Sequence, residues 1–147
     1  MVQRLSLEQI MPLRVRVLRK GTPATHAHYP EDEYDDVVHY GIVQDDTVIA
    51  TSTWFTKECP ERVGALAMQL KGMAVDNTLQ TSGLGRQLID AGIQLAQQNK
   101  AQVVWARARD TAVGFYEKCG FTVVGDGFID EPTGMPHHIV MRDITSL

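Results

Sequence analysis

The chain lacks several features that would assign it to particular classes of protein. It has only two cysteines in 147 residues, Cys59 and Cys119. These lie far apart and match no metal-binding or redox spacing, so we expect neither a zinc site nor a disulfide framework. No apolar run approaches the ~20 residues that a membrane helix needs, and residues 1–20 do not resemble a signal peptide. We therefore expect a cytoplasmic protein with no membrane partner.

Excess positive charge is also missing, because the formal net charge is −4 at pH 7. Proteins that bind nucleic acids usually carry a basic stripe, so no nucleic-acid partner is expected. The histidines have no ligand spacing with cysteine or carboxylate partners, and no metal is expected. The length fits one domain over residues 1–147, and the hydrophobic content of 44% is enough for a core. A small molecule or a specific protein is the expected substrate.

Hydrophobic periodicity predicts strands and helices in mixed order. A capping box formed by Ser6 and Gln9 predicts a helix that ends near Arg19, and Asp45 and Asp46 predict a hairpin turn. The expected strands lie at 2–5, in two runs of 37–55, and at 65–75, 101–108, 122–126 and 137–144; further helices end near Asn99 and at Gly120. This order predicts an α/β (α+β) fold whose mixed, mostly antiparallel sheet is flanked by helices.

Two glycines, Gly83 and Gly85, stand in the polar turn "LQTSGLGRQLI" directly before a predicted helix. Such glycines let the backbone pass close to a bulky group, and a helix N-terminus behind them attracts an anion. A P-loop needs Lys and then Ser or Thr, where this chain has Arg86 and Gln87. A dinucleotide-binding turn needs a third glycine at Leu88, so an oxidoreductase is a weaker alternative. The glycines could also serve only close helix–strand packing.

The remaining pattern resembles the acetyl-CoA motif, Q/R-x-x-G-x-G/A, of the GNAT superfamily of acyl-CoA-dependent N-acetyltransferases. It lies in "LKGMAVDNTLQTSGLGRQLI", and the later stretch "AVGFYEKCGF" is similar to the family's A-x-x-F-Y-x-x-x-G-F. The resemblance is close over 69–124, whereas the N-terminal half matches only in its order of elements. Arg109 departs from the family, which often has Asn three residues before the Ala of the second motif.

This resemblance implies a GNAT-like enzyme that transfers an acetyl group from acetyl-CoA to a primary amine by direct attack. It implies that Tyr116 is the catalytic acid that protonates the leaving thiolate, and that the N–H of Met73 or Val75 polarises the thioester carbonyl. The cofactor contacts that it implies are Met73, Ala74, Val75, Gln80, Thr81, Ser82, Gly83, Leu84, Gly85, Arg86 and Phe115.

The acceptor side is less defined by the sequence. We expect acceptor contacts from His28, Glu58 and His138, and the further candidates for a general base are His26, Asp76 and His137. The carboxylates of "PEDEYDD" (31–36) would attract a cationic amine, or they form a solvated loop. Tyr116 could instead be a core residue, and the alternative function is a non-catalytic CoA-binding sensor or partner module. The acceptor is a small-molecule or peptide amine, and a homodimer is left open.

Overall fold

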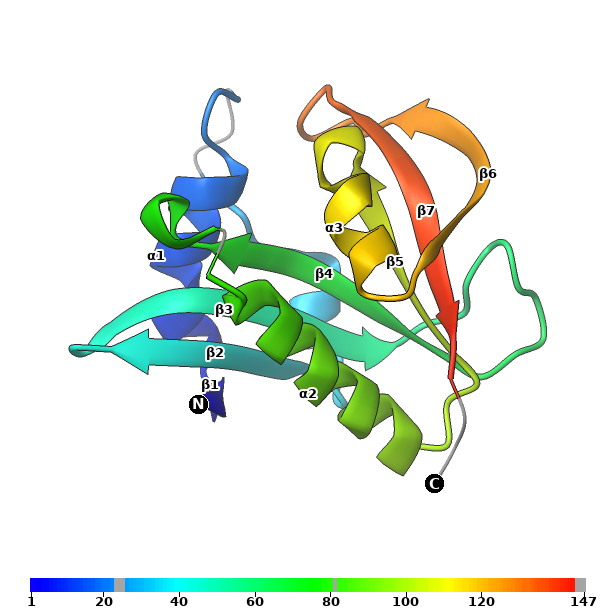
Figure 1. Cartoon of the computed structure of the whole chain (residues 1–147), viewed down its shortest axis with the longest axis horizontal. Helices are drawn as coiled ribbons and strands as arrows, with labels where there is room; N and C mark the ends of the chain where they lie inside the picture. The colour runs from blue at the N-terminus through cyan, green and yellow to red at the C-terminus, as the bar shows by residue number, and fades with distance from the viewer. Residues whose placement is uncertain (23–25, 81, 145–147) are drawn as a thin grey trace. The chain divides into compact units, whose positions relative to one another are not determined.

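The computed structural model describes residues 1–22, 26–80 and 82–144. Within them, seven strands follow the order β1-β2-β3-β4-β5-β7-β6 in one sheet, with three α-helices (Figure 1). All the paired neighbours that we describe are antiparallel except β4 and β5, which are parallel. The predicted mixed, mostly antiparallel sheet with flanking helices is therefore confirmed. The strands are β1 (Val2–Leu5), β2 (Val38–Gln44), β3 (Thr47–Thr56), β4 (Ala67–Val75), β5 (Val103–Arg109), β6 (Thr122–Ile129) and β7 (Pro136–Asp143).

The chain forms two compact units. Unit 1 comprises Met1–Phe55 and Lys71–Gly92, and unit 2 comprises Thr56–Leu70 and Ile93–Leu147. Unit 1 contains α1 (Leu7–Leu18) and the first part of α2 (Leu84–Gln98), and unit 2 contains α3 (Val113–Lys118). The strand β4 passes from unit 2 into unit 1 between Leu70 and Lys71.

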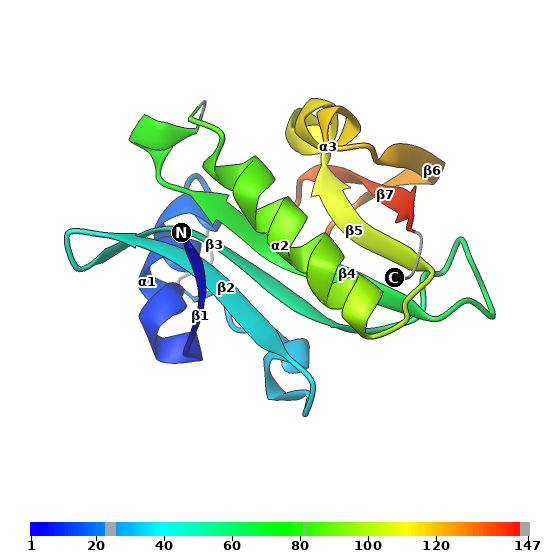
Figure 2. The same cartoon turned by 60° about the horizontal axis from the view of Figure 1, so that its bottom comes forward.

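In unit 1 the two helices lie on opposite faces of the strands (Figure 2). Successive residues of a strand point to opposite faces, and β3 follows this rule. Thr53 accepts a hydrogen bond from Arg14 of α1, whereas Ala50 packs with Ile42 and Leu88 of α2. The two faces of β3 therefore pack against different helices, α1 on one side and α2 on the other.

Local signals set the ends of these elements as the sequence predicts. Ser6 and Gln9 form the capping box at the start of α1, with Ser6 accepting from the Gln9 N–H at 3.2 Å. Asp45 and Asp46 both have positive φ, 52° and 62°, which gives the tight turn between β2 and β3. Gly120 ends α3 with φ 89°. These three features could be predicted because each depends on residues that are only a few positions apart in the chain.

In unit 2 the strands β5 and β7 pair along their length, from Val103 with Asp143 to Arg109 with His137. One face carries the core of Cys59, Ala67, Val103, Trp105 and Met141. On the opposite face Arg142 donates to the carbonyl of Cys119, the residue that follows α3. Unit 2 therefore has a closed apolar core on one face and α3 on the other.

We predict that Gly92→Ala destabilises the protein, although alanine favours a helix over glycine by about 1 kcal/mol. A Cβ at Gly92, within α2, would overlap the fully buried indole of Trp54. We expect the free energy of unfolding in urea to fall by about 1–3 kcal/mol.

The matched control is Gly114→Ala in α3, where a Cβ would meet nothing within 4 Å. It should leave the free energy of unfolding unchanged or raise it slightly. Equal effects of the two substitutions would mean that the Trp54 contact does not restrict residue 92.

Candidate cofactor and acceptor site

The glycine turn lies in unit 1, between η2 (Asn77–Leu79) and α2. Gly83 has φ 85°, a left-handed backbone that glycine adopts without strain. A Cβ there would meet nothing within 4 Å, so the backbone conformation, and not crowding, favours glycine at this position. The carbonyl of Gly83 accepts from the Gln87 N–H at 3.2 Å, which is the first bond of the helix.

The first turn of α2 provides donors for an anion. The leading N–H groups of any α-helix have no partner within the helix, and the helix dipole gives them partial positive charge. Here they belong to Leu84, Gly85 and Arg86. Gly85 is buried and Arg86 is exposed. This arrangement fits a phosphate group of an acyl-CoA at the turn.

Side chains of the turn are tied to its own backbone. Gln80 Nε2 donates to the Val75 carbonyl at 3.3 Å and to Asn77 Oδ1 at 3.1 Å. The Ser82 hydroxyl donates to the Leu79 carbonyl. Thr81, which was expected to contact the cofactor, lies outside the described residues. Gln80 thus links the end of β4 to the turn.

The C-terminal half of β4 belongs to the same unit. Ala74 is buried, and Met73 and Val75 are half-buried. The parallel pairing with β5 joins Ala67–Leu70 to Val103–Ala106, and β4 continues beyond it to Val75. This later part of β4 is the segment whose N–H groups, by the family resemblance, are predicted to contact the thioester.

Within β4, Gly72 has a left-handed backbone with φ 67°. A Cβ on it would lie 3.1 Å from Arg14 Nε and 3.2 Å from Tyr29 Cε2. Both the positive φ and the close contacts favour glycine over other residues here. Gly72 is therefore a position of close approach between β4 and the side chains of Arg14 and Tyr29.

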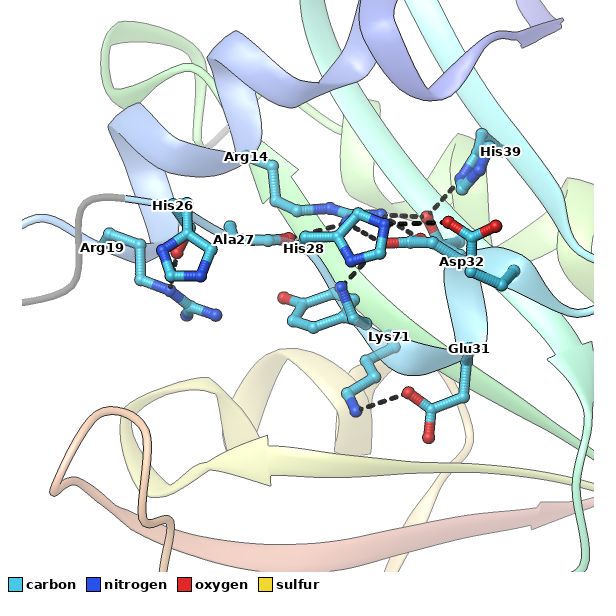
Figure 3. Close-up of polar contacts among 12 residues, drawn as sticks. Arg14, Arg19, His26, Ala27, His28, Glu31, Asp32, His39 and Lys71 are labelled. Carbon is cyan, nitrogen blue, oxygen red and sulfur yellow. Dashed lines mark hydrogen bonds and ion pairs between the residues drawn. The ribbon is translucent and has the colours of Figure 1, made fainter.

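Arg14 is the centre of a buried polar network on this side of unit 1 (Figure 3). Its side chain is 0% exposed and pairs through both terminal nitrogens with Asp32, at 2.8 and 3.1 Å. It also donates to the Ala27 carbonyl at 2.8 Å and to Thr53 Oγ1 at 2.7 Å. Asp32 in turn accepts from the Tyr29 N–H at 2.8 Å, which fixes the turn η1 (Pro30–Glu33).

His39 extends this network from β2. Its Nδ1 lies 2.8 Å from Thr53 Oγ1, and the residue is buried. Burial lowers the pKa of His39; the Asp32 charge raises it and the Arg14 charge lowers it. His39 is therefore held in its neutral form more strongly than a solvated histidine.

The acidic segment 31–36 has a different role from the expected one at Asp32. We expected its carboxylates to attract an amine or to be solvated, but the Asp32 side chain is 0% exposed and neutralised by Arg14. Glu31 pairs with Lys71 Nζ at 3.0 Å, and Glu33 lies 3.2 Å from His28 Nε2. The prediction is wrong for Asp32, because its charge is used inside the fold.

Asp76, one of the proposed bases, caps η2. It accepts from the Thr78 N–H at 3.1 Å and hydroxyl at 2.9 Å, and from Arg16 at 2.9 Å. The Thr78 N–H bond, then the hydroxyl bond and Arg16, lower the pKa of Asp76. A lowered pKa makes a carboxylate a weaker base.

Tyr116 and Phe115 lie on α3 in unit 2. Tyr116 is buried, with its ring edge-on to Phe115 and Phe121 at centroid distances of 5.2 and 5.4 Å. Phe115 is half-buried. The aromatic contacts hold the Tyr116 ring in place, while its catalytic role stays a prediction.

The three expected acceptor contacts divide between the units. His28 belongs to unit 1 and is exposed, whereas Glu58 and His138 belong to unit 2. Glu58 accepts from the Gly64 N–H at 2.6 Å and so holds its own loop. His138 Nδ1 lies 2.7 Å from Asp110 Oδ1. As acceptor contacts, all three stay predictions.

His138 and Asp110 form the histidine–carboxylate pair nearest to α3 in sequence. His137 and His138 are successive residues of β7, opposite Arg109 and Ala108 of β5, so their side chains point to opposite faces of the sheet. His137 is buried, with Nδ1 2.9 Å from the Met135 carbonyl. His137 is thus tied to backbone, while His138 has a carboxylate that orients its ring.

Both cysteines are buried thiols that form no disulfide in the part of the chain that the structure describes, and burial raises the pKa of the Cys59 thiol. Among the described residues no cluster of three metal-ligating side chains occurs. The part of the chain that the structure describes also has no helix long and apolar enough to cross a membrane.

Comparisons with known proteins agree with this fold. Residues 44–138 match the model of the acetyltransferase (GNAT) domain. YitI of Bacillus subtilis strain 168, described as an uncharacterized N-acetyltransferase, is 31% identical over 140 residues, covering 95% of this chain and 93% of YitI.

Solved structures show the same fold at lower identity. ElaA of Escherichia coli has a TM-score of 0.77 at 18% identity, covering 97% of this chain and 99% of that one. An aminoglycoside 6'-N-acetyltransferase solved with coenzyme A has a TM-score of 0.73 at 12% identity, covering 100% and 98%.

The class defined by these matches is the acyltransferases that use acyl-CoA. The chain belongs to the GNAT acetyltransferase family. The family assignment made from the two sequence motifs is therefore confirmed.

We predict that His39 makes stability depend on pH. Because its folded pKa is lowered from 6.5, the unfolded chain binds a proton there more readily than the native protein does. The stabilising contribution is present above about pH 6.5 and is lost as the pH falls toward the folded pKa. The free energy of unfolding should therefore fall from pH 7.5 to pH 5, and less so in His39→Gln.

The control for this titration is His26→Gln, since His26 is exposed. That variant should keep the wild-type slope of unfolding free energy against pH. If His39→Gln has the wild-type slope as well, His39 does not titrate differently in the two states.

Proposed function

We propose that the chain transfers an acetyl group from acetyl-CoA to a primary amine by direct attack of the amine. The observation that carries this proposal is the turn at Gly83, which directly precedes α2 and follows β4 and η2. It occurs in a chain of the GNAT family. When bound, acetyl-CoA supplies an activated thioester. The chain's own residues bind it, orient it and move protons.

The turn would hold the pyrophosphate. The N–H groups of Leu84 and Gly85 lie at the start of α2, where the helix dipole favours negative charge. Arg86 is exposed beside them and adds a cation that can bond two phosphate oxygens. The open space around the Gly83 Cβ position leaves room for such a group.

The later part of β4 would orient the acyl group. Its backbone passes through the left-handed Gly72 before it reaches Met73. The N–H of Met73 or Val75 would donate to the carbonyl oxygen, where negative charge grows as the amine attacks. A fixed backbone donor is effective because it needs no reorganisation during the reaction.

Tyr116 would donate a proton to the leaving thiolate as general acid. A phenol is protonated at neutral pH, so it carries a proton that it can donate to the thiolate as the C–S bond breaks. The rings of Phe115 and Phe121 restrict its orientation. No covalent enzyme intermediate is needed, and both cysteines are buried.

We predict that Gly83→Val weakens acetyl-CoA binding. A β-branched residue is strained at φ 85°, and its side chain would fill the space beside the helix N-terminus. Calorimetric titration with acetyl-CoA should show a loss of affinity of about tenfold or more.

The matched control is Gly64→Val, because Gly64 has φ 89° and equally open surroundings but lies in a loop of unit 2. It should cost comparable stability and leave acetyl-CoA affinity unchanged. No saturable acetyl-CoA binding by the wild type would refute the proposed function itself.

We predict that Tyr116→Phe lowers kcat by about 100-fold, the typical contribution of a positioned general acid. The KM for acetyl-CoA should change little, since the ring and its packing are kept. The measurement is steady-state release of CoA with a responsive amine. Tyr34→Phe, at an exposed tyrosine, serves as the control, and an unchanged kcat in Tyr116→Phe would identify Tyr116 as a core residue.

A further inference from the structure

Three cationic side chains surround the ring of Tyr29 in unit 1. Arg14 Cζ lies 4.4 Å from the ring centroid, Lys71 Nζ 4.6 Å and Arg19 Cζ 5.8 Å. The ring is also 3.2 Å from the Cβ position of Gly72, the residue before Met73. The cluster therefore adjoins the segment of β4 that the proposed function assigns to the acyl group.

Two of the three cations are neutralised by carboxylates. Arg14 pairs with the buried Asp32 at 2.8 Å, and Lys71 pairs with Glu31 at 3.0 Å. Both carboxylates are less than a tenth exposed. These two pairs leave the cluster with one further positive charge, on Arg19.

Arg19 is held in place by neutral groups. Its Nε donates to the His26 carbonyl at 3.1 Å, an interaction drawn in Figure 3. Burial raises the pKa of Tyr29, while the Arg14 and Arg19 charges and a hydrogen bond from Arg19 act to lower it. In the part of the chain that the structure describes, no carboxylate forms an ion pair with Arg19.

Among the described residues, the lack of an acidic partner distinguishes Arg19 from the two other arginines of this segment, Arg14 and Arg16. Arg14 and Arg16 each have an acidic partner, Asp32 and Asp76. Arg19 follows at the C-cap of α1 and is half-buried. A fixed, partly desolvated guanidinium without a counter-ion binds a carboxylate more strongly than a mobile surface arginine does.

We propose that Arg19 recognises a carboxylate of the acyl acceptor, so that the acceptor is an amino acid with a free carboxyl group. This inference rests on the proposed function for the amine that reacts at β4. The buried Tyr29 ring is close both to the Arg19 guanidinium, 5.8 Å from its centroid, and to the Gly72 Cβ position, 3.2 Å from Cε2, so Arg19 belongs to the same cluster as the segment of β4 at which the amine would react. The planar fork of Arg19 would donate hydrogen bonds to both carboxylate oxygens.

The test compares acceptors that differ only in charge. Amino acids from α-amino acids to longer ω-amino acids are each assayed with their amides, at fixed acetyl-CoA. We expect the best acid to exceed its amide in kcat/KM by about 10- to 100-fold, the usual range for a hydrogen-bonded charged pair. Arg19→Gln should remove this ratio by raising the KM for the acid, with kcat/KM for the amide and the KM for acetyl-CoA unchanged.

The control variant is Arg4→Gln, which removes the same charge from an exposed arginine of β1. It should retain the preference for the acid. Thermal unfolding of each variant checks that Arg19→Gln remains folded, and Arg19→Lys should recover part of the preference. An equal loss for acid and amide, a raised KM for acetyl-CoA, no preference in the wild type, or loss of the preference in Arg4→Gln would overturn the proposal.

Direct binding separates this inference from the proposed function. If no amine is acetylated, the same acids and amides are titrated calorimetrically into the protein with CoA present. Saturable binding of an acid, but not of its amide, that Arg19→Gln abolishes would support the Arg19 site and refute the catalytic function. Absence of such binding would overturn the Arg19 site as well.

Discussion

The buried ion pair of Arg14 and Asp32 is the interaction on which the packing of α1, η1 and β3 in unit 1 depends. A guanidinium with no exposed surface is stable only if carboxylate and hydrogen-bond partners replace water. Here those partners come from the 26–36 segment and from β3, through Ala27, Asp32 and Thr53. Removing one partner of such a pair typically costs about 3–5 kcal/mol, because the other charge stays buried. The pair therefore fixes the 26–36 segment against α1 and β3.

The position of the pair also shapes β4. The Arg14 side chain and the Tyr29 ring occupy the space beside Gly72, where the strand adopts a left-handed backbone. The direction of the following N–H groups depends on that residue. Packing on one face of the sheet is thus connected to the geometry of the backbone that would contact the acyl group.

Features of short range could be predicted from the sequence, and features of long range could not. The Ser6 cap, the Asp45–Asp46 turn and the glycine turn each depend on residues close together in the chain. The Arg14 network joins residues that are 13 to 39 positions apart in the chain. Short sequence motifs do not predict contacts over such separations. One signal was available: Arg14 occupies the i+4 position from Ile10 on the buried face of α1, where an apolar residue is usual.

Gly83 and Gly92 are only nine positions apart but are constrained for unrelated reasons. The substitutions that each position tolerates over evolution should therefore differ. At Gly83 the fold limits the handedness of the backbone but not the volume of a side chain. Asparagine or aspartate, which tolerate such a backbone and already do so at Asp45 and Asp46, would satisfy the fold there. At Gly92 the backbone is helical and the limit is volume alone, set by Trp54. Variants selected for folding alone should therefore include asparagine or aspartate at residue 83 but only glycine at residue 92. If glycine is nevertheless kept at residue 83, the constraint comes from binding of the ligand at the turn.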